Sequence, residues 1–343
     1  MARKLLAAIV AMPLLAASVH ATDKPDKRAA AAALISNALK ISDIRAPGSP
    51  PFELHATLTV PVRNRKAATG TYTLTWVSHD RWREEIHFIG YSRIRFGGMN
   101  KYWQVRSLNY ELPPIYDFSE GFGFARDLQA ALDGPYWSQK ADGKIETKQR
   151  KLGKQRVTCV YLTNPDSRFT SEFCFDPGQG TLVRGGFPGF GVAEYSDFRA
   201  FQGKLSPATV RITSDGDTLL TFQLDRISAL EIVDTSLFVS PAGSILFADC
   251  RVNGQGAEEP STKTLPNYPV GDRAAHISGK VDVYAVVGSD GALHNIKILA
   301  SPSSGLTDAT LQALKGWRYK PASCSGQPEQ SEIIITVIYN LGG

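Results

Sequence analysis

The last part of the chain, from Leu265 to Leu341, constrains the fold more than any other stretch. Apolar and polar residues alternate through Gly279–Val287, which is typical of a half-buried β-strand. The next residues, Gly288–Gly291, contain Asp-Gly, a pair suited to the positive backbone angles of a hairpin turn. Ala292–Ala300 is predicted to be the second strand, and its alternation breaks once. Together these segments predict a β-hairpin.

A helix and a final strand follow the hairpin. Apolar residues recur at helical spacing through Thr307–Trp317, and Thr307 or Asp308 can cap the first turn. Glu332–Leu341 is a long apolar run, EIIITVIYNL, with the length and composition of a last strand. The predicted order is therefore strand, turn, strand, short helix, strand.

Six motifs in this stretch resemble the C-terminal domain of the TonB family. They occur in the family's order, within the structural context that the family requires, so chance is a poor explanation. The resemblance implies a three-stranded antiparallel sheet with one helix packed on it. The motifs are Pro266-Asn267-Tyr268-Pro269, Gly279–Val283, Asp290-Gly291, the helix Leu306–Leu314, Trp317–Ala322 and Gly326–Pro328.

The resemblance also implies a binding function. In the TonB family the partner is a short segment of an outer-membrane transporter, so an outer-membrane transporter or another envelope protein is the implied partner here. An extended segment can add to the edge of such a sheet by β-augmentation. A homodimer through the last strand is an alternative, and Leu265 stands where the energy transducer often has Gln. The implied partner-binding residues are Leu265, Pro266, Asn267, Tyr268, Pro269, Ile333, Ile334, Ile335, Thr336, Val337, Ile338 and Tyr339.

The larger part of the chain is predicted to be mainly β. Alternating segments separated by turn residues run from Phe52 to Ile227, which predicts an antiparallel meander with helices at residues 26–40 and 122–132. The segments Asp80–Ile86, Asp197–Val210 and Thr235–Gly243 resemble the LolA-like periplasmic lipoprotein carriers. That resemblance implies a half-barrel covered by helices and able to bind an apolar or lipid ligand. The predicted fold class is α+β, mainly β, with this LolA-like domain and the small TonB-like domain.

The start of the chain predicts export to the periplasm. Arg3 and Lys4 precede the apolar run Leu5–Val19, and small residues follow, so residues 1–21 have the layout of a signal peptide. A membrane-spanning helix needs roughly 20 apolar residues. An uncleaved inner-membrane anchor facing the periplasm remains the alternative. Residues 250–264 are polar and are predicted to link a domain at 22–249 to one at 265–343.

Four cysteines are expected to form two disulfides, because disulfides persist in exported proteins. Cys159 and Cys174 flank the turn-forming Asn164–Arg168, and a hairpin centred there places them opposite each other. Cys250 and Cys324 are then the second pair. Neither pair has the spacing of zinc ligands, so no metal site is expected.

Charge and motif content argue against several function classes. The formal net charge is only +5 and the basic residues are scattered, so no nucleic-acid partner is expected. The sequence contains no GxSxG, HExxH, P-loop or GxGxxG before a helix. Glu84 and Glu85 are adjacent in a predicted strand, so their side chains point to opposite faces and cannot act as an acid–base pair. We therefore expect neither an enzyme nor a cofactor.

Three functions fit these patterns. The first is a periplasmic interaction protein, related to TonB-dependent transport, whose C-terminal domain binds an envelope partner by strand addition. The second is a periplasmic lipid or lipoprotein carrier that uses the same domain for docking. The third is an energy transducer anchored by residues 5–21, although a linker of about fifteen residues at ~3 Å each is far too short to cross the periplasm.

Overall fold

The computed structural model describes residues 27–341 apart from 63–64, 99–100, 116–127, 129–130, 133–143, 164–169, 187–190, 215, 249–259 and 325. The predicted signal peptide, most of the predicted linker, and Cys250 lie outside the described residues. The described residues form two domains. The large domain is residues 27–248 and the small domain is residues 260–341.

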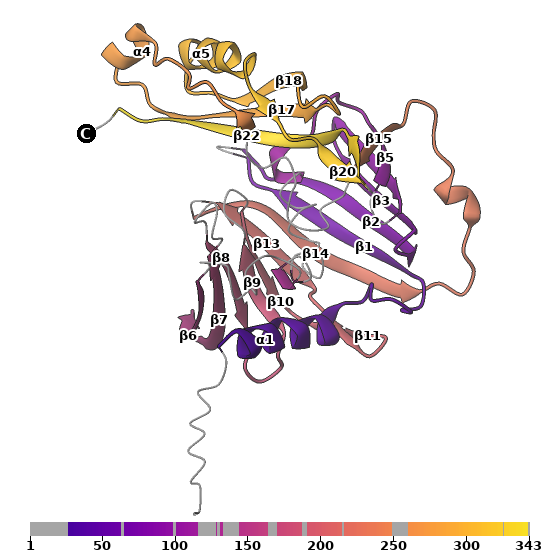
Figure 1. Cartoon of the computed structure of the whole chain (residues 1–343). Coiled ribbons are helices and arrows are strands. Elements are labelled where there is room, and N and C mark those ends of the chain that lie inside the picture. The colour runs from indigo at the N-terminus through magenta and orange to yellow at the C-terminus, as the bar shows by residue number, and fades with distance from the viewer. Residues whose placement is uncertain are drawn as a thin grey trace, which may run out of the picture.

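The large domain is built on one open antiparallel sheet of thirteen strands, ordered β15-β5-β4-β3-β2-β1-β14-β13-β10-β9-β8-β7-β6. Most neighbours in space are neighbours in sequence, as the predicted meander requires, and β15 and β6 form the two edges. The sheet bends strongly and does not close into a barrel (Figure 1). The strands are β1 Phe52–Val60, β2 Ala68–Ser78, β3 Arg81–Phe88, β4 Tyr91–Gly97, β5 Lys101–Arg106, β6 Ile145–Leu152, β7 Gln155–Thr163, β8 Thr170–Phe175, β9 Leu182–Gly186, β10 Val192–Ser196, β13 Thr209–Ser214, β14 Asp217–Ala229 and β15 Ile245–Ala248.

The large domain also contains helices and a small hairpin outside this sheet. Helix α1 (Lys27–Ser42) packs on the sheet through Ala31, Ile35 and Ala38, which are fully buried. Strands β11 (Arg199–Phe201) and β12 (Lys204–Ser206) form a separate hairpin, and the 3₁₀ helix η2 (Thr235–Phe238) is capped by Asp234.

The inner face of the large sheet is the face that carries the apolar core. The core forms because every second side chain of a strand points inward. Strand β1 is an example, since its alternate residues Phe52, Leu54, Ala56 and Leu58 are all buried. Further along the sheet the same face changes character. Ile86 on β3 lies opposite Arg93 on β4, and Arg93 lies opposite Arg106 on β5. Across β3, β4 and β5 the inner face is therefore lined by charged side chains, and this part of the inner face is called the charged floor below.

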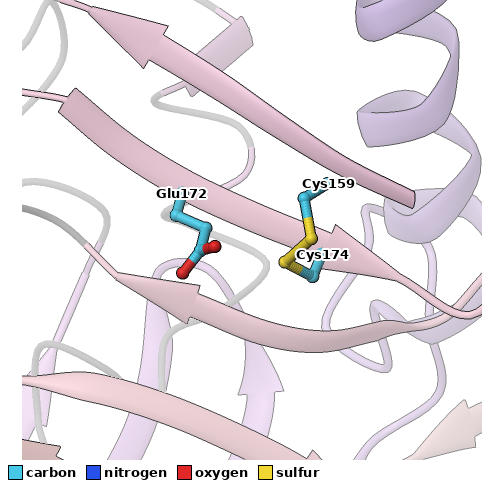
Figure 2. Close-up of side chains that lie close together, drawn as sticks. All are labelled: Cys159, Glu172 and Cys174. Atoms are coloured by element: carbon cyan, nitrogen blue, oxygen red, sulfur yellow. A yellow bond between two sulfur atoms is a disulfide. The ribbon is translucent and has the colours of Figure 1, made fainter. Parts of the chain in front are cut away.

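A disulfide joins β7 to β8 on the other face of the sheet. Cys159 and Cys174 are directly opposite in the ladder, as the hairpin register predicted, and their sulfurs are bonded (Figure 2). Both are fully buried in a small cluster with Val157. Cys324 is also disulfide-bonded, while its predicted partner Cys250 lies outside the described residues.

The small domain has the sheet that its sequence predicts. Three antiparallel strands are ordered β18-β17-β22, and helix α5 packs on one face of them. The core on that face includes Val281, Val283, Leu314 and Ile335. The elements are β16 Pro260–Thr262, α4 Val270–Ala274, β17 Gly279–Val287, β18 Leu293–Ala300, α5 Ser304–Leu314, β19 Arg318–Tyr319, β20 Ala322–Cys324, β21 Gln327–Glu329 and β22 Ser331–Tyr339.

Two details differ from the prediction. Helix α5 begins one turn earlier than expected, because the Ser303 hydroxyl accepts a hydrogen bond from the Leu306 amide at 3.0 Å and caps the first turn. Neither Thr307 nor Asp308 is the cap. The small domain also contains the short helix α4 and the small strand pairs β16–β19 and β20–β21 in addition to the predicted sheet and helix.

The small domain packs on the large domain through the sheet face opposite α5. In Figure 1 its strands lie over the end of the large sheet formed by β3, β5 and β15, with α4 and α5 on the far side. A shared apolar cluster joins the two domains, with Tyr102 and Phe247 from the large sheet and Tyr284 and Val286 from β17. The charged part of the inner face therefore lies beneath the small sheet.

Candidate functional site

Strand β22 forms one edge of the small sheet. It pairs with β17 from Ser331↔Val287 to Tyr339↔Gly279, and within the described residues no strand pairs with its other side. An edge of this kind presents unpaired backbone N–H and C=O groups that can accept another strand. The predicted partner-binding residues of the last strand, 333–339, all lie on β22.

The backbone pairing shows which β22 amides face this open edge. Gly288 donates its N–H to the Ala292 carbonyl at 2.9 Å, toward β18. Because N–H groups alternate in direction along a strand, the amide of Val283 points the other way, toward its β22 partner Ile335. The odd-numbered amides of β22 therefore bond to β17. The even-numbered amides, those of Ile334, Thr336 and Ile338, point to the open edge.

The two faces of β22 also differ, because one is buried and the other is partly exposed. Ile335, Val337 and Tyr339 are buried against the helix side of the sheet. On the opposite face Thr336 donates a hydrogen bond to Asp282 at 2.7 Å, and Ile338 is 59% exposed. A strand added at this edge would extend both faces, with Ile338 available to pack against its side chains.

The structure brings the second predicted binding region next to the end of β22. The ring of Tyr268 meets that of Tyr339 edge-on, with centroids 5.4 Å apart, and the Tyr268 hydroxyl donates to the Ile277 carbonyl. Pro269 is the N-cap residue of α4. Leu265 is 75% exposed, and Pro266 and Asn267 lie between it and Tyr268, outside any helix or strand. Tyr268 thus connects this segment to the end of β22.

The interface between the domains contains a buried carboxylate, that of Glu332 at the start of β22. Arg95 donates to it at 3.1 Å, and Arg106 also donates to it. The hydroxyls of Tyr102 and Tyr284 donate to it at 3.1 and 2.7 Å. The Gln104 amide lies 3.3 Å away. One carboxylate of the small domain is therefore held by four side chains of the large domain and one of its own.

The network continues inward along the charged floor. Arg93 forms ion pairs with Glu84 and with Glu111, the latter at 2.7 Å. Arg95 also contacts Glu111, at 3.3 Å. The sequence correctly separates Glu84 from Glu85, since Glu85 instead pairs with Arg83. Burial and neighbouring cations act in opposite directions on Glu84, and the cations Arg93 and Arg95 prevail, so its pKa is lowered.

The same competition sets the pKa of Glu332. Burial alone would raise this pKa, but the charges of Arg95 and Arg106 and the hydrogen bonds from Tyr284 and Arg106 lower it to about 2. Glu332 is therefore ionised in the folded protein at neutral pH.

This lowered pKa predicts a pH dependence of stability. The folded-state pKa of Glu332 is about 2, below its ordinary value of 4.5, so the stabilisation is complete above about pH 4.5 and is lost as pH falls toward 2. Glu332→Gln should flatten this part of the stability curve. Urea unfolding of both proteins between pH 4.5 and 2 measures it, since those are the limits that the two pKa values set. Parallel curves would contradict the assignment.

Sequence reasoning missed the interdomain residues. The alternation in Gly279–Val287 predicts that Tyr284 lies on the polar face of its strand, opposite Val281 and Val283, yet Tyr284 is fully buried because the large domain covers that face. Arg93 and Arg95 follow Tyr91 at alternate positions of β4, so they share the inward face of a core residue. An arginine at two successive inward positions of a strand was the available signal for a buried ionic cluster.

One cluster of metal-ligating residue types lies elsewhere, on β7 and β8. Within the described residues Cys159, Glu172 and Cys174 are close enough to share an ion (Figure 2). The two sulfurs are bonded to each other, so neither is a thiolate that could hold zinc. Glu172 is instead paired with Arg150 and Arg184, at 2.5 and 3.1 Å.

Comparison with known protein families shows which family the small domain resembles. Residues 264–341 match the family described as Gram-negative bacterial TonB protein C-terminal. The match covers the Tyr-Pro segment, α5 and the three strands of the small sheet, so the TonB resemblance predicted from the sequence is confirmed. No curated protein matches the chain as a whole or in part.

Solved structures resemble the remainder of the chain more distantly. A LolA superfamily protein from Nitrosomonas europaea is 9% identical and covers 61% of this chain and 97% of its own, with a TM-score of 0.37. A putative outer membrane lipoprotein-sorting protein domain from Vibrio parahaemolyticus is 11% identical over 60% of this chain and 97% of its own, with a TM-score of 0.36. A DUF1329 family protein from Desulfovibrio piger is 10% identical and covers 63% of this chain and 98% of its own, with a TM-score of 0.43. Scores below 0.5 support no statement about function.

A membrane anchor was one of the alternatives for this chain. Over the described part of the chain, no helix has the length and apolar character needed to cross a bilayer. The predicted anchor at residues 5–21 lies outside that part.

Proposed function

We propose that this protein is a non-catalytic interaction protein of the Gram-negative periplasm whose TonB-like small domain captures an extended segment of an envelope partner. The observation that carries the proposal is the open edge of β22, with the amides of Ile334, Thr336 and Ile338 directed outward. The family match at residues 264–341 supports the same function. The partner is an outer-membrane transporter or another envelope protein.

The surroundings of β22 limit how much of it a partner can use. Gln330, just before the strand, donates a hydrogen bond to the Leu246 carbonyl of β15 at 2.7 Å. Strand β15 therefore lies beside the beginning of β22 and restricts a captured segment to the part from Ile333 to Tyr339. We infer that the partner segment is about seven residues long, which is an ordinary strand length.

The interaction function is favoured over the lipid carrier. A carrier needs a cavity on the inner face, and α1 packs there with Ala31, Ile35 and Ala38 fully buried among the sheet residues. In the described part of the small domain, by contrast, the β22 edge is open in the structure as it stands. Among the described residues, α1 thus occupies part of the face where an apolar ligand would lie.

Site-directed photocrosslinking in the full-length protein tests the proposal. A photoreactive residue at position 338, beside the open edge, should crosslink to an envelope protein in living cells. The same residue at position 315, exposed at the end of α5, should not, because Lys315 lies on the helix side of the sheet. Equal crosslinking from both positions, or none from position 338, would refute strand capture at β22.

A further inference from the structure

The side chains around Glu332 form a complete binding slot for a carboxylate. Arg95, Arg106 and Tyr102 of the large domain all donate to its two oxygens. Gln104 adds its amide, and Tyr284 adds a hydroxyl from the small domain. Arg95 and Gln104 are 8% and 3% exposed, so the donors are held in place by their surroundings. Charge-assisted hydrogen bonds from arginine are the strongest and most specific way to bind a carboxylate.

Charge balance gives Glu332 a particular place in this slot. Among the residues that the structure describes, the large domain contributes three cations to the cluster, Arg93, Arg95 and Arg106, and two anions, Glu84 and Glu111. The small domain supplies the third anion, Glu332, through Arg95 and Arg106. Without the small domain, Arg95 and Arg106 therefore lose the carboxylate that they share, and their N–H groups can donate to one other anionic group in its place.

The interface also has the composition of a contact that can open. Its apolar cluster has four buried members, Tyr102, Phe247, Tyr284 and Val286. Beside them lie the ion pairs that Arg93 and Arg95 make with Glu111, and these would persist within the large domain after separation. Interfaces between domains that separate are in general more polar than permanent interfaces. A floor made of ion pairs tolerates water, whereas an apolar floor would not.

We propose that the Arg95–Arg106 slot on the inner face of the large domain is a carboxylate-binding site, and that Glu332 occupies it as a built-in competitor of a carboxylate-bearing ligand. The small domain then acts as a cover that is released when an external carboxylate takes the slot. This proposal does not depend on strand capture at β22.

Chemical rescue with acetate tests the site in the full-length protein. Hydrogen exchange in β4 and β5 reports whether the floor is covered, and β7, on the distant half of the sheet, is the internal control. Glu332→Ala should raise exchange in β4 and β5 by at least about tenfold without changing β7. Sodium acetate should reverse this increase, because in this variant it fills the space left by the missing Glu332 carboxylate without displacing the small domain, whereas sodium chloride at equal ionic strength should not. Arg106→Gln added to Glu332→Ala should abolish the reversal.

The unmodified protein tests the competition. Acetate should increase exchange in β4 and β5 of the wild type above the level seen in chloride, because it displaces the Glu332 side chain. Rescue of Glu332→Ala by chloride as well as acetate would overturn the carboxylate site, and so would rescue that survives Arg106→Gln. Rescue by acetate with no opening of the wild type would overturn the role of Glu332 as a competitor. Glu332→Gln, which keeps the shape of the side chain, provides a second folded variant for the same comparison.

Discussion

Replacing Glu332 with alanine should lower the free energy of unfolding by about 3–5 kcal/mol. The reason is what the substitution leaves behind. The side chains of Arg95 and Arg106 are only 10% and 7% exposed, and each loses its contact with the Glu332 carboxylate and keeps only Glu111, at 3.3 and 3.7 Å. The cost is therefore mainly that of leaving two buried cations with one shared carboxylate, and only in part the loss of the attraction itself. Urea unfolding followed by far-UV circular dichroism measures it.

Glu329 provides a matched control three positions earlier in the chain. It also forms an ion pair between the domains, with Lys101, but the two side chains are 26% and 42% exposed. Exposed pairs contribute about 0–1 kcal/mol, so Glu329→Ala should change stability little. Similar effects of the two substitutions would mean that Glu332 has no special role in holding the domains together.

Local chemistry explains why the fold of each domain could be predicted. The alternation in Gly279–Val287 and the apolar run at Glu332–Leu341 correspond to β17 and β22 within a residue or two, because these strands bury one face in their own domain. The one break in alternation in Ala292–Ala300 is a bulge, where Asn295 has a φ of 49°. The cap of α5 was missed because Ser303 and Thr307 have equally suitable side chains, and only the backbone geometry separates them.

The contacts between the domains could not be predicted in the same way. Arg95 and Glu332 are 237 residues apart, and no period or motif links them. From the sequence, Glu332 is a polar residue at the start of a strand, and such residues are usually exposed. Its burial depends on where β5 places Arg106 and Gln104, which is a property of the assembled tertiary structure. The predicted partner-binding residues depend on the resemblance, and their function stays a prediction.

Strand β22 combines the two proposed functions of the small domain. The side chain of Glu332 at its start binds the large domain, while the backbone from Ile333 to Tyr339 forms the open edge. A partner strand that pulled on this edge would therefore also pull on the contact between Glu332 and the large domain. Rigid strands transmit such displacements, so release of the cover and capture of a partner are expected to be coupled.

Replacing Thr336 with proline should abolish partner capture and leave the small domain folded. The Thr336 amide points to the open edge, so proline removes a hydrogen bond that only a captured strand would receive. Its ring also occupies the space where that strand would lie. The lost hydrogen bond alone is worth about 1 kcal/mol, and with the steric block the crosslinking yield from position 338 should fall at least about tenfold. Crosslinking in cells, with circular dichroism of the purified variant, measures both properties.

Two further substitutions separate loss of the edge from loss of the fold. Thr336→Val also removes the hydrogen bond to Asp282 but keeps the amide, so it should capture the partner normally. Ile335→Pro removes an amide that bonds to β17, so it should unfold the small sheet instead of only closing the edge to a partner. If Thr336→Pro remained folded and still captured its partner, the partner would have to bind elsewhere, and the exposed surface around Leu265 would be the next candidate.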